Sequence, residues 1–148
     1  MEIINIIMLW LHYLATVMWI GGMAFNLLVL RPSMAVIEQN QRPVLGASVL
    51  KRFIIFAWLS IAVLVLTGIL INYNRIASDN IPATYGIVLL GKHFVTSIMI
   101  LVVAWVSFVL SGKLAPFAPK PDTILILVKT NLSLGILVLF LTSALRVA

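Results

Sequence analysis

The sequence contains no cysteine, and only four of its 148 residues are acidic. The lack of cysteine excludes disulfide bonds, thiolate metal sites, cysteine nucleophiles and covalent c-type haem attachment, which needs a Cys-x-x-Cys-His motif. The four carboxylates, Glu2, Glu38, Asp79 and Asp122, lie in loops or at the ends of apolar runs, so no carboxylate pair exists inside those runs. No phosphate-binding glycine loop, nucleophile elbow or zinc motif is present either. Nothing in the sequence therefore resembles a hydrolase.

Apolar residues fill most of the chain: 63% of the residues are hydrophobic and 9% are charged. Soluble proteins have about 25% charged residues, and a small soluble domain has too much surface to hide so many apolar side chains. The apolar runs at 3–30, 53–73, 85–110 and 124–145 each exceed the roughly 20 residues that cross a hydrocarbon core. The sequence predicts an all-α integral membrane protein whose residues 1–148 form one domain of four transmembrane helices.

Lysine and arginine lie mostly between the apolar runs and give a formal net charge of +6. We interpret this excess as membrane topology, so no nucleic-acid partner is expected. Seven of the ten basic residues are on the side of the membrane that carries loops 31–52 and 111–123, and three are on the opposite side. The positive-inside rule then places both termini outside, and short loops favour an up-down-up-down bundle. The predicted location is the bacterial inner membrane, with lipid as the surrounding partner.

Three ionisable residues, His12, Lys92 and His93, lie well inside the predicted spans. Such residues are costly in a membrane and are functional candidates for that reason. His12 lies about 14 Å along its helix from Ile3, and His93 lies about 12 Å along its helix from Tyr85. Since the first and third helices start on the same side, we expect the two histidines at nearly the same depth. They are the only histidines in the chain.

Each histidine belongs to a stripe of residues that recurs every seven positions. The stripes are His12, Trp19 and Asn26 in the first span, and Gly86, His93, Ile100 and Ser107 in the third. Residues at this spacing share one helix face, and small or polar residues in membrane helices normally face other helices. We therefore expect both histidines to face the bundle interior.

Helices that lie diagonally across a bundle are about 12–14 Å apart, which leaves room for a planar haem with one axial histidine on each side. The leading prediction is a small b-type cytochrome in which His12 and His93 ligate one haem b. Lys92 and Arg75 would contact the haem carboxylates, and Trp19 would lie beside the haem. The predicted task is electron transfer, with quinone or within a larger redox complex.

Other interpretations stay open. One histidine alone would also bind haem, or both histidines would hydrogen-bond between helices or form a proton path. Copper is the alternative metal, because thioether sulfur is a soft ligand. The methionines available for it are Met8, Met18, Met23 and Met99. Lys92 would also reach the outer interface by extending its side chain. Whether the chain is an enzyme is open; an oxidoreductase is the class expected, with catalytic residues unknown.

Short segments in all four spans carry a family resemblance. They are Trp10-Leu-His12-Tyr-Leu-Ala-Thr-Val-Met-Trp19-Ile-Gly21-Gly22, Lys51-Arg52-Phe53, Leu66-Thr67-Gly68, Tyr85-Gly86-Ile-Val-Leu-Leu-Gly-Lys92 and Asn131-Leu-Ser-Leu-Gly135. Together they resemble the CopD family of bacterial membrane proteins, named for copper resistance, and more distantly the HemJ family of protoporphyrinogen oxidases.

The resemblance implies a four-helix membrane fold and, on the CopD side, copper transport or resistance. On the HemJ side it implies haem b binding with a functional histidine in the first helix and a functional lysine in the third. His12 and Lys92 match those two positions, and Arg52 matches a basic residue at the start of the second helix. His93 departs from the shared pattern and is what allows a two-histidine site. A homodimer or a place in a larger complex is the expected assembly.

Overall fold

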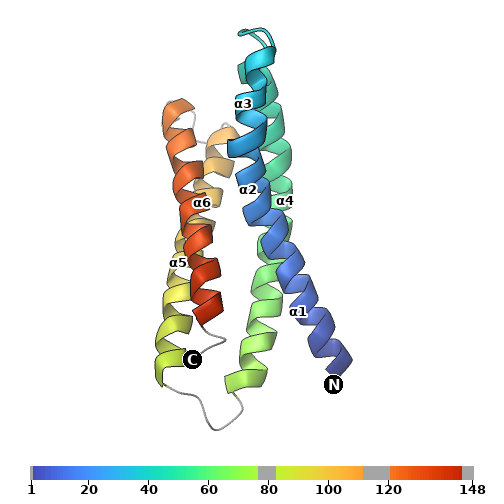
Figure 1. The fold of residues 1–148 in the computed structure, drawn as a ribbon, viewed down its shortest axis with the longest axis vertical. Helices are drawn as coiled ribbons and strands as arrows, with labels where there is room; N and C mark the ends of the chain where they lie inside the picture. Colours follow the sequence, from blue (N-terminus) through green and yellow to red (C-terminus); the bar gives the residue numbers. More distant parts are fainter. Residues whose placement is uncertain (1, 77–82, 112–120, 145–148) are drawn as a thin grey trace. The chain divides into compact units, whose positions relative to one another are not determined.

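The computed structural model describes residues 2–76, 83–111 and 121–144, and within these ranges every regular element is helical (Figure 1). Four helices are long and apolar enough to cross a membrane: Glu2–Val36, Arg42–Tyr73, Ala83–Leu110 and Asp122–Ala144. They confirm the predicted all-α membrane protein with four spans. The chain divides into two compact units, Met1–Ile71 and Asn72–Ala148, which are described in turn.

The first helix of unit 1 changes its winding several times. In order it comprises α1 (Glu2–Thr16), the π-helical η1 (Val17–Gly21), α2 (Gly22–Phe25), the π-helical η2 (Asn26–Leu30), α3 (Arg31–Ser33) and the 3-10 turn η3 (Met34–Val36). Pro32 has no backbone N–H and, in a regular α-helix, its ring clashes with the carbonyl four residues earlier. The wider η2 segment contains that residue, Leu28, so the helix loosens where the proline requires it.

The second helix, α4 (Arg42–Ile76), is 35 residues long. At 1.5 Å per residue this is about 52 Å, well beyond a hydrocarbon core of about 30 Å. It begins eleven residues before the predicted start at Phe53, because hydropathy marks only the part of a helix that lies in lipid. The Arg42 guanidinium ties this early end to the first helix: Nε donates to the Ile37 carbonyl at 3.1 Å and Nη2 to the Ala35 carbonyl at 2.8 Å.

Two contacts set the direction of α4 against the first helix. His12 contacts Thr67, and Gly22 contacts Phe53, so a later residue of the first helix contacts an earlier residue of α4. The two helices are therefore antiparallel (Figure 1). A Cβ atom on Gly22 would collide with the Phe53 ring, so the helices approach this closely without moving that ring only because residue 22 is glycine. Small residues at such crossings are the usual way in which membrane helices pack closely.

Unit 2 contains α5 (Ala83–Leu110) and α6 (Pro121–Ala144), which pack against each other and run in opposite directions (Figure 1). Pro121 occupies the first position of α6, where its missing N–H has no intrahelical partner to lose. Asp122 lies in the first turn, where a negative charge favours the helix dipole. These bounds agree with the predicted spans to within three residues.

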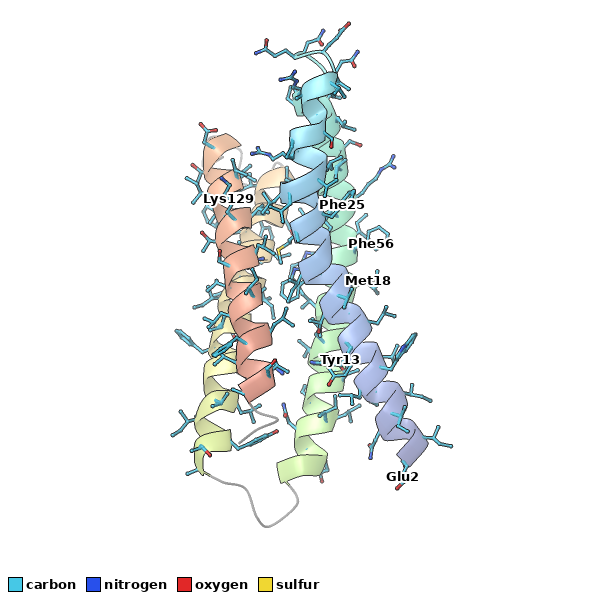
Figure 2. All side chains as sticks on the ribbon, in the orientation of Figure 1. Glu2, Tyr13, Met18, Phe25, Phe56 and Lys129 are labelled. Carbon is cyan, nitrogen blue, oxygen red and sulfur yellow. The ribbon has the colours of Figure 1, made fainter. Side chains whose placement is uncertain are left out.

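The described surface is largely apolar. Phe25 and Phe56, labelled in Figure 2, are 56% and 52% exposed, and Phe94 and Phe140 are 69% and 70% exposed. Large apolar patches of this kind are unfavourable in water. The exposed phenyl rings are placed to contact lipid chains.

Candidate functional site

His12 lies in α1, is half-buried, and contacts α4 directly. Its Nδ1 atom is 2.8 Å from Oγ1 of Thr67, a residue that is 3% exposed. The next residue, Gly68, leaves room beside the ring, since a Cβ there would lie 3.7 Å from Cε1 of His12. The imidazole is therefore held inside the apolar part of unit 1 by a hydrogen bond that joins two helices.

Thr67 also bonds to its own helix. Its hydroxyl donates to the Val63 carbonyl at 2.6 Å, and the Leu64 carbonyl lies farther away at 3.4 Å. Threonine commonly makes this bond to the carbonyl four residues earlier in membrane helices. Thr67 is thus fixed on α4 before it meets His12.

The predicted stripe on the first helix is inward-facing. Trp19 is buried, and His12 and Asn26 are half-buried, with Ala15 and Met23 buried on the same face. Two of the candidate methionines, Met8 and Met23, follow this face. Met18 does not, because it is 40% exposed, and Figure 2 labels it on the first helix.

Trp19 occupies the π-helical segment η1 and is 3% exposed. Its Nε1 atom is buried and has no hydrogen-bond partner among the described residues. An unsatisfied buried donor costs about 1–3 kcal/mol, and π-helical turns often occur at functional sites. The indole N–H is therefore suited to an oxygen atom of a bound molecule or water.

His93 lies on α5 and is exposed. Its Nδ1 is 2.7 Å from the Leu89 carbonyl of the same helix, and Ser97 Oγ donates to the His93 carbonyl at 2.9 Å. All of these contacts are local to one face of α5. These local contacts leave both the inward direction of His93 and its role as a ligand as predictions.

The interior stripe of α5 is displaced by one residue from the predicted one. Tyr85, Met99 and Val106 are buried at seven-residue spacing, and Lys92 is half-buried at the remaining position of this series. The predicted stripe followed small and polar residues, whereas the helix buries its larger side chains. Lys92, rather than His93, thus shares the buried face.

Arg75 lies in the last turn of α4, and its side chain is outside the described part of the structure. Within that part, no group of three or more histidine or acidic residues could hold a metal ion. Sequence reasoning missed the contact between Thr67 and His12, although both residues stood in segments that carried the family resemblance.

The comparisons with known proteins identify a family for this chain. The family model described as copper resistance protein D matches residues 47–145, about two-thirds of the chain, including Thr67, Lys92 and His93 but not His12. No curated protein and no solved structure matches the chain. With its four membrane-spanning helices, the chain belongs to the copper resistance protein D family of multi-pass proteins of the bacterial inner membrane.

Proposed function

We propose that this protein handles copper inside the membrane and that His12 is the residue that binds the ion. Membership of the copper resistance protein D family supports copper as the substrate. The observation that carries the role of His12 is its cross-helix hydrogen bond to Thr67 inside the apolar span. Imidazole is a common metal ligand, and an ionisable residue is retained in a span chiefly for function.

Met8 supplies a second ligand of the right kind. It precedes His12 by four residues, is half-buried on the same face, and carries a soft thioether. Residues four apart on a helix have Cβ atoms about 5–6 Å apart, close enough for both side chains to reach one ion. Imidazole with thioether suits Cu(I). Met23 lies on the same face, about 16 Å along the helix axis from His12, and would be a second binding position for a moving ion.

Copper transport into proteoliposomes tests this function. Purified protein is reconstituted, and Cu(I) uptake is compared for the wild type, His12→Ala, Met8→Leu and Met18→Leu. We expect His12→Ala to abolish uptake and Met8→Leu to slow it. Met18→Leu is the matched control, because the exposed Met18 should contribute nothing. Equal uptake by the wild type and His12→Ala would contradict the proposal.

The b-type haem predicted from the sequence is the second candidate, and the HemJ-like oxidation of protoporphyrinogen depends on it. The buried Trp19 N–H favours a bound molecule with an acceptor oxygen, which a haem carboxylate would provide. A visible spectrum of the purified protein tests it. A sharp α band on reduction, lost in His93→Ala, is expected for the two-histidine haem; a colourless preparation that contains copper contradicts it. Only this second candidate would need a quinone or a redox partner protein with which to exchange electrons.

A further inference from the structure

Thr67 has one hydroxyl proton and two close polar neighbours. Its Oγ1 atom is 2.6 Å from the Val63 carbonyl oxygen and 2.8 Å from Nδ1 of His12. A carbonyl oxygen only accepts, so the proton in the short contact with Val63 must come from Thr67. The single proton of the hydroxyl is therefore already used within α4.

The contact with His12 must then take its proton from the histidine. Thr67 Oγ1 accepts, and Nδ1 of His12 donates. A neutral imidazole carries one ring proton, so protonation of Nδ1 leaves the lone pair on Nε2. Metal binding uses the neutral ring, and a metal-binding histidine almost always donates its other N–H to a fixed oxygen.

We propose that Thr67 is a positioning residue that holds His12 in the Nδ1–H tautomer and so makes Nε2 the atom that binds copper. This inference rests on the proposed function for its metal, whereas the tautomer is argued from the two short contacts of Thr67 and a neutral ring. Copper replaces whatever contact Nε2 makes without the ion. Thr67 suits the task because it is buried and is anchored to its own helix.

Nitrogen NMR tests the tautomer without any metal. The His93→Ala variant leaves His12 as the only histidine, so the ¹⁵N signals of one ring are assigned directly. At a pH where the ring is neutral, we expect a protonated Nδ1 and an unprotonated Nε2. In the same background, Thr67→Val should give a mixture of tautomers, because valine keeps the shape of threonine but accepts no hydrogen bond. A spectrum of the His93→Ala protein, with Thr67 intact, that shows Nε2 protonated would overturn the proposal.

Copper affinity tests what the tautomer does. Removing an outer partner of a metal ligand typically costs 10–100-fold in affinity, so we expect Thr67→Val to weaken Cu(I) binding by about that factor. Thr67→Ser keeps the hydroxyl and should restore binding. Thr142→Val is the matched control, since Thr142 makes the same kind of bond to the Val138 carbonyl, at 2.8 Å, in α6. Unchanged affinity in Thr67→Val would overturn the proposal.

The two measurements separate this inference from the proposed function. If the wild type binds no Cu(I), the proposed function fails and copper binding through Nε2 fails with it, whichever tautomer is found. If the wild type binds Cu(I) and Nδ1 is protonated, but Thr67→Ser binds Cu(I) as weakly as Thr67→Val, the inference alone fails. Thr67→Val could fail to fold, which its circular dichroism and elution volume would show. In that case the His12 tautomer with Thr67 intact and the Cu(I) affinity of Thr67→Ser test the inference. A protonated Nε2, or a Thr67→Ser affinity as low as that of His12→Ala, would overturn the inference.

Discussion

The two histidines of this protein are held by hydrogen bonds of nearly equal length but of different origin. Nδ1 of His12 lies 2.8 Å from a hydroxyl of another helix, 55 residues away in the sequence, whereas Nδ1 of His93 lies 2.7 Å from a carbonyl of its own helix. His12 is half-buried and His93 is exposed. A histidine bound to its own helix is fixed wherever that helix forms, but His12 is fixed only when α1 and α4 pack correctly.

The largest effect expected from this difference is on copper binding. His12→Ala removes the proposed ligand and should lower the Cu(I) affinity by more than about 100-fold, beyond the loss typical of an outer partner. His93→Ala should leave the affinity close to that of the wild type. A competition titration with a colorimetric Cu(I) chelator measures both. Equal losses in the two variants would remove the distinction between the histidines.

The packing that holds His12 should break at Gly22. Alanine there places a Cβ against the Phe53 ring and forces that ring to move, which typically costs about 1–3 kcal/mol. The free energy of unfolding in mixed detergent micelles measures this cost. Gly86→Ala is the control, because the added Cβ would meet nothing within 4 Å beyond its chain neighbours and the backbone of its own helix, and alanine favours a helix over glycine. Phe53→Leu should recover part of the loss, and no recovery would contradict the contact.

Arg42 should matter for the turn before α4 but not for the site. Arg42→Ala removes both bonds to the carbonyls of Ala35 and Ile37. A loss of one or two kcal/mol corresponds to about a five- to thirty-fold change in an opening equilibrium, so amide hydrogen exchange over residues 34–42 should speed up by that factor. Lys51→Ala, at an exposed position of the same helix, is the control. A change in the His12 ring signals would contradict this separation.

The smallest effect is expected at Gly68. An added Cβ would lie 3.7 Å from Cε1 of His12, an ordinary van der Waals distance, so Gly68→Ala should leave the ring in place. We expect Cu(I) affinity and the tautomer to stay as in the wild type, measured by the same titration and spectra. A loss as large as that of His12→Ala would show that the ring needs more room than the structure gives it.

The sequence predicts the fold well because the bilayer sets the length and apolar character of each span. It did not predict residues 42–52 of α4, since Arg42, Lys51 and Arg52 are polar and hydropathy detects lipid contact rather than helix. Nor did it predict the π-helical segments. Those depend on local crowding and on Pro32, which change the winding without changing the composition.

The site was predicted in part, for reasons of geometry. The face of His12 and Trp19 follows from spacing along one helix, which a sequence shows directly. The contact between His12 and Thr67 depends on the register of two helices, and no spacing within one helix determines it. On α5, the series of residues that contains His93 and the series that contains Met99 are offset by one residue, which is about 100° around the helix. Choosing by polarity selected His93, whereas the structure buries the stripe that contains Met99.

α4 runs without a break from Arg42 to Ile76, so its polar end and Thr67 belong to one continuous rod. Val44, 70% exposed near that end, is about 35 Å along the axis from Thr67. A rotation of α4 as a rigid body that releases the imidazole would turn Val44 through the same angle. A spin label attached at Val44, which precedes the apolar part of α4, would therefore report whether the His12 ring is bound to Thr67 or released.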